Sequence, residues 1–282
     1  MTSDPATNDA AAGNAETVTD DAVTDEVLLA VDDGVATITL HRPEVRNAIN
    51  AGMRTGVRAA IERCEHDPGV AVMILTGTDP AFCAGLDLRE LGSRPAEQLD
   101  DPDMGTRGSV SPFPDRTKPL IGAINGPAIT GGFEFALNCD FLIASERAVF
   151  ADTHARVGVM PGWGLSVLLA DAVGVRRARE VSLSGNFVSA QEALTWGLVN
   201  RVVPHDELLP TTTRIAADIA GNDPNGVARM LATYREQEDT QLADGWRIES
   251  DGARAFRAEV GFAPDEIEAR RASIIHRGRS QL

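Results

Sequence analysis

Two glycine-rich turns, each following a run of apolar residues, constrain the fold of this chain more than any other feature. Residues 70–75 have the character of a buried strand and lead into residues 82–88, Phe-Cys-Ala-Gly-Leu-Asp-Leu. Residues 119–125 are similar and lead into residues 126–134, Gly-Pro-Ala-Ile-Thr-Gly-Gly-Phe-Glu. The first N–H groups of a helix have no acceptor within it. Each turn can therefore direct free backbone N–H groups at one shared point.

A carboxylate follows the second turn, because Glu134 lies three residues after Gly131 and shares its helix face. Two N–H donors that face each other form an oxyanion hole, and a carboxylate beside them can move a proton. This layout stabilises an enolate. Two simpler interpretations remain open. Gly131-Gly132 would permit close packing of the helix, and Glu134 would gain about 0.3–1 kcal/mol from the helix dipole.

The order of strands and helices predicts a layered α/β core followed by a helical region. Residues 27–31 and 35–40 flank Asp32-Asp33-Gly34, a hairpin turn signal. Helical spacing of apolar residues follows at 51–65. Short strands are expected at 141–144 and 148–150. The pattern then becomes helical, with helices expected at 207–220, 224–240, 246–260 and 265–277.

Part of the net charge of −16 comes from the N-terminus, since residues 1–26 carry seven acidic residues and no Lys or Arg. This segment lacks a periodic apolar face, which predicts disorder. The acidic balance disfavours binding to nucleic acid. A second segment, 93–117, is rich in Pro, Gly and Asp, and we expect a mobile loop that can cover a pocket.

Several classes of site are not predicted. The sequence has no Gly-x-Ser-x-Gly elbow and no phosphate-binding Gly-x-x-x-x-Gly-Lys loop. Its five histidines lack metal-ligand spacing, so we expect no metal and no redox cofactor. Cys64, Cys83 and Cys139 are interpreted as reduced structural thiols of a cytoplasmic protein. No apolar run approaches the roughly 18 residues of a membrane helix, and the acidic N-terminus is not expected to be a signal peptide.

Four segments match a known family in order and spacing. His41-Arg-Pro-Glu-Val-Arg-Asn-Ala48 is similar to its Arg-Pro…Asn-Ala segment, and residues 82–88 are similar to its first oxyanion loop. Residues 118–140 resemble its second loop, and residues 181–200 resemble its later turn, helix and Gly-Leu-Val segment. On these motifs the chain resembles the crotonase (enoyl-CoA hydratase/isomerase) superfamily over roughly residues 27–280.

The resemblance implies a crotonase-like spiral of ββα units with a C-terminal helical oligomerisation layer, and acyl-CoA thioester substrates. Together with the composition of the N-terminus, it suggests a disordered acidic tail (1–25), an acyl-CoA-binding core (26–205) and a C-terminal helical region (206–282). Trimers that often pair into hexamers are implied as well. Apolar side chains late in the chain are expected to pack on a neighbouring subunit: Trp246, Phe256, Phe262, Ile274 and Ile275.

The resemblance also assigns roles by position. The N–H groups of Leu86 and Gly131 would hold the thioester oxygen, and Glu134 matches the glutamate that activates water in hydratases. The residues expected along the adenine and pantetheine path are Val45, Arg46, Ala48, Ala84 and Leu88. Arg46 has a simpler interpretation as a solvated charge. Because coenzyme A is part of the substrate, no separate cofactor is expected.

Two positions depart from the family pattern. Hydratases carry a second glutamate twenty residues after the first, where this chain has His154, and the first glycine of the usual Gly-Gly-Gly is Thr130. Asp152 is a candidate to orient the His154 ring. The expected activity is hydration of a 2-enoyl-CoA, with His154 serving the α-carbon proton. The alternatives are an enoyl-CoA isomerase, or an acyl-CoA-binding member with little or no hydratase activity.

Overall fold

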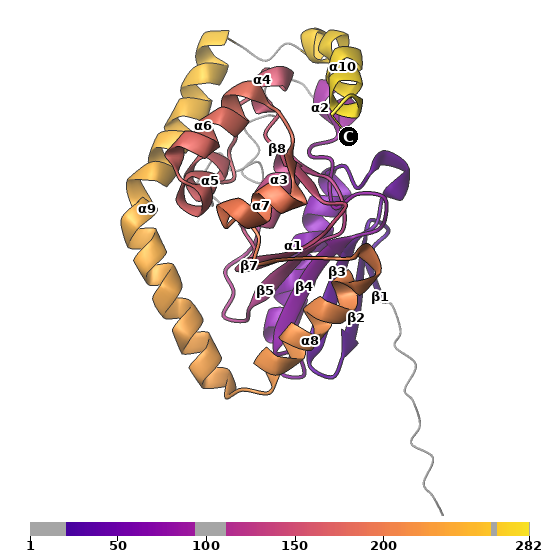
Figure 1. Ribbon diagram of the computed structural model, residues 1–282, viewed down its shortest axis with the longest axis vertical. Coiled ribbons are helices and arrows are strands. Elements are labelled where there is room, and N and C mark those ends of the chain that lie inside the picture. Colours follow the sequence, from indigo (N-terminus) through magenta and orange to yellow (C-terminus); the bar gives the residue numbers. More distant parts are fainter. Residues whose placement is uncertain (1–20, 94–110, 261–263, 282) are drawn as a thin grey trace, which may run out of the picture.

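A seven-stranded sheet forms the body of the molecule in the computed structural model, which describes residues 21–93, 111–260 and 264–281 (Figure 1). Its strand order is β1-β2-β3-β4-β5-β7-β10. The first three strands pair antiparallel, and the strands from β3 to β10 are parallel. The strands are β1 Asp21–Thr24, β2 Val27–Asp32, β3 Val35–Leu40, β4 Val72–Gly77, β5 Leu120–Ile124, β7 Phe141–Ser145 and β10 Arg201–Val203.

The parallel strands are covered on both faces, which explains their nearly continuous apolar sequences. In β4, Val72 and Ile74 belong to a cluster with α8 (Leu208–Ala220), whereas Met73 and Leu75 belong to the larger core. That core also receives the apolar face of α1 (Ala51–His66). Because the strand is buried on both sides, its end and the glycine turn after it are held in a fixed position.

A smaller sheet brings the two halves of the site together. It consists of β6 (Ala128–Ile129), β8 (Val149–Ala151) and β9 (Val188–Ser189). Strands β6 and β8 are parallel, with Ile129 opposite Ala151. The chain continues from β6 into α3 (Gly131–Leu137) and from β8 into α4 (His154–Val157). Two segments about twenty residues apart therefore begin side by side.

The remaining helices lie outside the two sheets (Figure 1). Helices α5 and α6 follow α4, and α7 follows β9. The long helix α9 runs along the outside of the molecule, and α10 packs against α2 and α4. Two short 3-10 helices precede α1 and α8. The bounds are η1 Pro43–Val45, α2 Leu88–Ser93, α5 Leu165–Val173, α6 Val175–Ser184, α7 Ala190–Trp196, η4 His205–Glu207, α9 Pro224–Val260 and α10 Pro264–Arg279.

Two predictions about the elements are wrong. The end of the predicted tail, residues 21–24, forms β1 and pairs with β2; the rest of that tail lies outside the described residues. Helices predicted at 224–240 and 246–260 are one helix, α9. Its Gly245 lies against α5, where an added Cβ would come 3.2 Å from Val167 Cγ1. The close packing that glycine allows compensates for its low helix propensity of about 1 kcal/mol.

Other predicted elements are present with ends shifted by one or two residues, and the hairpin at Asp32-Asp33-Gly34 joins β2 to β3. Most of the predicted covering loop, residues 94–110, lies outside the described residues, as does Phe262. None of the described helices is long and apolar enough to span a membrane.

The C-terminal helices are tied to the chain's own core. Arg235 of α9 pairs with Asp140 at 3.0 Å, and an added Cβ at Gly164 would overlap the ring of Trp246. Trp246 therefore packs within the chain. The side chains of Phe256, Ile274 and Ile275 line the chain's own cavity. Their packing on a neighbouring subunit stays a prediction.

Candidate active site

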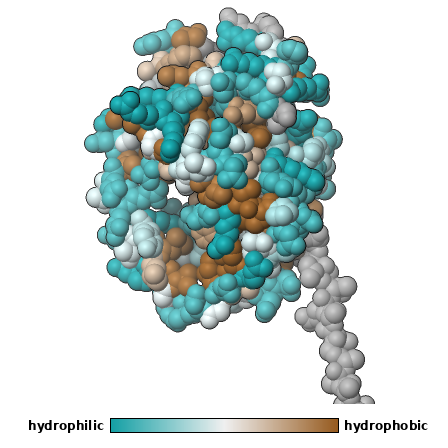
Figure 2. Space-filling view, in the orientation of Figure 1, coloured by the Kyte–Doolittle hydropathy of each residue, from teal (hydrophilic) through white to brown (hydrophobic). Residues whose placement is uncertain are grey.

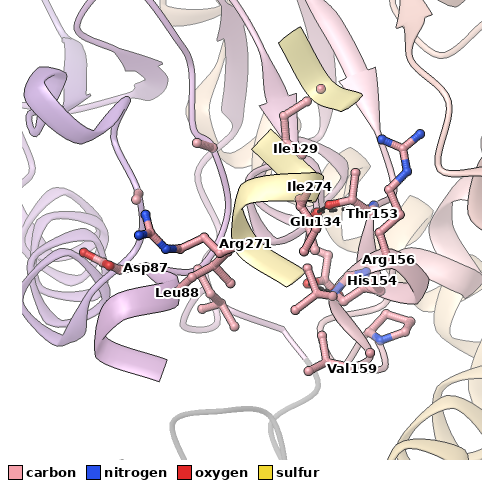
Figure 3. Close-up of a pocket in the computed structure, with 18 of the residues that line it drawn as sticks. Asp87, Leu88, Ile129, Glu134, Thr153, His154, Arg156, Val159, Arg271 and Ile274 are labelled. Carbon is pink, nitrogen blue, oxygen red and sulfur yellow. Dashed lines mark hydrogen bonds and ion pairs between the residues drawn. The ribbon is translucent and has the colours of Figure 1, made fainter. Parts of the chain in front are cut away.

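A cavity of about 560 Å³ lies between the two glycine turns, α4 and the C-terminal helices (Figure 3). Figure 3 shows Glu134, Thr153 and His154 together on one side, with Asp87 and Leu88 across from them. Gly131 and Asp152 are not part of the cavity lining, and the other residues predicted for the site are: Val45, Arg46, Ala48, Ala84, Leu86, Leu88, Glu134 and His154. The structure thus brings together residues from four separate segments of the sequence.

The Arg-Pro…Asn-Ala segment holds the first glycine turn in place. Asn47 is fully buried, and its side-chain amide donates to the backbone oxygens of Thr78, Ala81 and Phe82. Its side-chain oxygen accepts the N–H of Arg42, whose guanidinium pairs with Asp87 at 3.2 Å. Asn47 has a φ of 56°, a left-handed conformation that asparagine tolerates better than most residues.

Leu86 N–H is left free by the way this turn pairs. Ile49 N–H donates to Gly85 O at 2.8 Å and Asp87 N–H donates to Ile49 O at 2.9 Å, so the bridge uses the groups on either side of Leu86 N–H. A Cβ placed on Gly131 would be 3.6 Å from Leu86 N. Neither Leu86 N–H nor Gly131 N–H has an acceptor among the described residues. Together they can bind an anionic oxygen.

The close approach of the two turns requires glycine. Gly85 has a φ of +90°, and an added Cβ would come 2.8 Å from Ile129 O. At Gly132 an added Cβ would overlap the backbone oxygen of Cys83. The packing interpretation of Gly132 is therefore correct, and it is compatible with a binding role for the neighbouring Gly131 N–H.

Glu134 is 3% exposed and held by two backbone groups. Its Oε1 accepts Trp163 N–H at 2.8 Å and Gly162 N–H at 3.2 Å. Burial raises the pKa of Glu134 to about 7; the charge of Glu249 adds to the shift, and His154 and the two N–H groups oppose it. A carboxylate with this pKa can both take and return a proton near neutral pH.

His154 lies between two carboxylates. Its Nδ1 is 2.7 Å from Asp152 Oδ1, and its Nε2 is 3.6 Å from Glu134 Oε2. Because a carboxylate only accepts, Nδ1 carries a proton and Nε2 faces Glu134. Burial lowers the pKa of His154, but the hydrogen bond to Asp152 and the charge of Glu134 outweigh it, so the net shift is upward. The prediction that Asp152 orients the ring is confirmed.

The two departures from the family pattern, Thr130 and His154, are linked through Thr153. Thr130 Oγ1 is 2.5 Å from Oγ1 of Thr153, the residue before His154. Thr153 N–H also donates to Thr130 Oγ1 at 3.3 Å. Thr130 has φ 55° and ψ −112°, a backbone conformation that a side chain disfavours. The sequence singled out Thr130 but gave no reason to choose Thr153.

Glu249 was missed by sequence reasoning altogether. It lies on α9, is 6% exposed, and accepts the N–H groups of Gly164 and Ser166, both at 2.7 Å. Its partners are more than 80 residues away in the chain. The only sequence signal is a glutamate with Trp246 and Ala253 one turn before and after it, which marks the buried face of the helix.

A Ser–His–Asp chain also exists away from the cavity. His205 Nδ1 is 3.0 Å from Ser145 Oγ, and its Nε2 is 2.9 Å from Asp79 Oδ2. Ser145 is fully buried at the end of β7 and does not line the cavity. A nucleophile needs access to substrate, so we interpret this chain as a structural link between β7, η4 and the loop after β4.

The described residues contain no group of three or more His, Cys, Asp and Glu side chains arranged to hold a metal ion. All three cysteines are free and buried, in agreement with their interpretation as structural thiols. Burial raises the pKa of the Cys83 thiol, beside the first glycine turn, to about 12. Such a thiol is a poor nucleophile at neutral pH.

Comparison with known proteins identifies the family. The enoyl-CoA hydratase/isomerase family model matches residues 30–261. The chain is 38% identical to a probable enoyl-CoA hydratase of Rhizobium meliloti (strain 1021), over 91% of this chain and 98% of the relative. It is 36% identical to the probable enoyl-CoA hydratase 1, peroxisomal, of Arabidopsis thaliana, over 87% and 91%. The crystal structure of an enoyl-CoA hydratase from Mycobacterium tuberculosis H37Rv matches with a TM-score of 0.77 at 49% identity, over 83% of this chain and 100% of that one. The chain belongs to the enoyl-CoA hydratase/isomerase family, that is, to the crotonase superfamily.

Proposed function

We propose that this protein is an enoyl-CoA hydratase, which adds water to a 2-enoyl-CoA through an enolate. One observation carries the proposal: Glu134 and His154 face each other at 3.6 Å beside the free N–H groups of Leu86 and Gly131. The pair supplies a base for water and an acid for carbon. The two N–H groups supply a site for the negative charge that develops between these two proton transfers.

Substrate would enter along the wall formed by the first turn and the Arg-Pro…Asn-Ala segment. The residues proposed for the adenine and pantetheine path all line the cavity: Val45, Arg46, Ala48, Ala84 and Leu88. The thioester oxygen would then accept hydrogen bonds from Leu86 N–H and Gly131 N–H. An oxyanion-hole donor of this kind is worth about 2.7–4 kcal/mol in the transition state. Coenzyme A arrives with the substrate, and the proposed reaction requires no other cofactor.

The reaction balances with these two side chains alone. Glu134 takes a proton from water while the water oxygen bonds to the β-carbon, and the electrons of the double bond move to the thioester oxygen. The His154 imidazolium then protonates the α-carbon as the enolate collapses. This leaves a neutral His154 facing a protonated Glu134. Transfer of one proton from Glu134 to His154 restores both groups for the next cycle.

The alternatives predict different products. An isomerase would use the same oxyanion site to shift a double bond, without adding water. A binding member of the family would hold acyl-CoA and convert none of it. The contact of His154 with Asp152 favours turnover, because it raises the pKa of the group at the second acid/base position. A position kept only for binding has no need of such a proton donor.

Incubation with a panel of enoyl-, hydroxyacyl- and dienoyl-CoA esters tests the proposal, with products identified by mass. We expect a 2-enoyl-CoA to give a product heavier by one water. In the reverse reaction, the 3-hydroxyacyl-CoA should lose one water. An unchanged mass with a shifted double bond would indicate an isomerase. Binding without any product would contradict an enzymatic role.

We also propose that the protein assembles as a homotrimer or hexamer. Helix α9 exposes large apolar side chains, with Met230 63%, Tyr234 68% and Ile248 60% exposed. Figure 2 shows hydrophobic side chains gathered on the face between α9 and the body of the molecule. Exposed apolar surface of this kind is typical of interfaces. Light scattering at micromolar concentration tests this, and a clean monomer would contradict it. A cytoplasmic location stays a prediction.

A further inference from the structure

Residues 162–166, the end of the loop before α5 and the first two residues of that helix, bind two buried carboxylates through neighbouring backbone groups. We call this segment the 162–166 loop. The N–H groups of Gly162 and Trp163 donate to Glu134 Oε1. The N–H groups of Gly164 and Ser166, and the Ser166 hydroxyl, donate to Glu249. Residues 162–166 therefore join the proposed base on α3 to a glutamate on α9. A shift of this loop would move the donors of both carboxylates together.

Glu249 is fixed in place by burial, by its hydrogen bonds and by the packing of its neighbours on α9. It is 6% exposed, and the ring of Trp246, one turn earlier on α9, packs against Gly164. Ala253, one turn later, is buried and lines the cavity. Glu249 Oε1 accepts Gly164 N–H, and Oε2 accepts both groups of Ser166. The charge thus lies at the N-terminus of α5, where an anion is stabilised by the unpaired N–H groups of the helix.

A direct chemical role for Glu249 does not fit this geometry. The residue is absent from the cavity lining, whereas its neighbours Ser250 and Ala253 are part of it. Both of its oxygen atoms are already occupied by N–H or O–H donors. Glu249 therefore cannot replace the second catalytic glutamate that the family carries where this chain has His154.

We propose that Glu249 is a positioning residue for Glu134: it fixes the 162–166 loop, whose N–H groups orient the base, and so links the C-terminal helix α9 to the catalytic pair. This role rests on the proposed function for its catalytic consequence, although the fixing of the loop does not. The C-terminal helix then does more than enclose the cavity. It holds the donors that set the direction of the Glu134 carboxylate.

The charge of Glu249 acts in the same place. The groups that face Glu134 are His154 from α4, Glu249 from α9 and the two N–H groups of the loop. His154 is faced by Asp152, Glu134 and Glu249. The negative charge of Glu249 raises the pKa of Glu134 and that of His154. Removal of that charge should shift both limbs of a pH–rate profile to lower pH.

The test compares Glu249→Gln with Glu259→Gln, an exposed glutamate on the same helix. A glutamine at 249 loses the charge, and its NH2 group would face an N–H donor. We expect Glu249→Gln to lower kcat about 10- to 100-fold, the cost of misplacing a reacting group, and to move the acid limb to lower pH. KM should change little. Glu259→Gln should match the wild type.

Two further measurements keep the inference falsifiable. Ser166→Ala removes a single donor at an exposed position, and we expect kcat to fall severalfold with KM unchanged. Backbone hydrogen exchange at Gly162 and Trp163 should be faster in both variants than in the wild type. Two results would overturn the inference. One is a Ser166→Ala variant whose hydrogen exchange and kcat both equal those of the wild type. The other is a folded Glu249→Gln variant whose pH–rate profile does not shift. An inactive wild type would instead refute the proposed function, and hydrogen exchange would still test the fixing of the loop.

Discussion

Glu134 Oε2 and His154 Nε2 lie 3.6 Å apart, and neither residue is more than 5% exposed. Each of these groups alters the protonation of the other. The charge of Glu134 raises the pKa of His154, and the charge of His154 lowers that of Glu134. The two side chains therefore behave as one acid–base unit, and the proposed reaction requires the form in which Glu134 is ionised and His154 is protonated.

Replacement of His154 by alanine separates a catalytic from a structural role. If His154 protonates the α-carbon, His154→Ala should lower kcat by about 10²- to 10⁴-fold. The alkaline limb of the pH–rate profile, which reports loss of the imidazolium proton, should disappear. The acid limb should move to higher pH, because the histidine charge no longer lowers the pKa of Glu134.

His66→Ala is the matched control, since His66 is exposed on α1 and lies outside the cavity. His154→Ala could instead show that His154 only shapes the pocket and does not donate a proton. Acyl preference and KM would then change while kcat and the alkaline limb of the profile stayed as in the wild type.

Asp152→Asn tests whether the Asp152 carboxylate raises the pKa of His154. The carboxylate of Asp152 holds Nδ1 and raises the pKa of His154. Asparagine still offers an oxygen to Nδ1–H but carries no charge, so the pKa of His154 should fall. The alkaline limb should therefore move to lower pH, with a smaller loss of kcat than in His154→Ala. Asp218→Asn, at an exposed position on α8, provides the control. An alkaline limb that does not move would show that Asp152 has no influence on His154.

The strained backbone at Thr130 predicts an unusual order of stabilities. Glycine at this position relieves a strain of about 1–3 kcal/mol and loses the two hydrogen bonds to Thr153, each worth about 0.5–1.5 kcal/mol. Alanine loses the same two bonds to Thr153 but keeps the strain. Thr130→Gly should therefore be more stable than Thr130→Ala, the reverse of the usual order. Urea unfolding of the two variants measures this, and a more stable alanine variant would contradict the strain.

The sequence was most informative where local chemistry decides the structure. The two glycine turns were predicted because each follows a strand buried on both faces, and Glu134 was placed by its spacing from Gly131. The strand at Asp21–Thr24 was not predicted, because its acidic, polar sequence gains its structure only from pairing with β2. The continuity of α9 was missed because it depends on Gly245 meeting Val167 of a distant helix.

Contacts between distant segments explain the rest of what was missed in the site. Thr153 contacts Thr130 because β6 and β8 pair and bring the two residues together, and the sequence alone does not show this pairing. The proposed role of Glu249 depends on backbone N–H groups. Every residue except proline has such a group, so the sequence does not show which ones bind a carboxylate. A glutamate on a mostly polar helix therefore gives no indication that it binds the loop next to the base.

Glu134 is the proposed base that activates water, and Glu134→Gln tests this role. Glutamine keeps the size of the side chain and an oxygen for the N–H groups of Gly162 and Trp163, so folding and acyl-CoA binding should be nearly unchanged. In the wild type, kcat should fall as pH drops through about 7, where Glu134 becomes protonated.

The measurement is the amount of hydrated product formed from a 2-enoyl-CoA, identified by mass, with wild type and Glu134→Gln at equal concentration and equal acyl-CoA saturation. We predict product heavier by one water from the wild type and a rate lower by about 10²- to 10⁴-fold from the variant. Hydration by Glu134→Gln at the wild-type rate would contradict the assignment of Glu134 as the base.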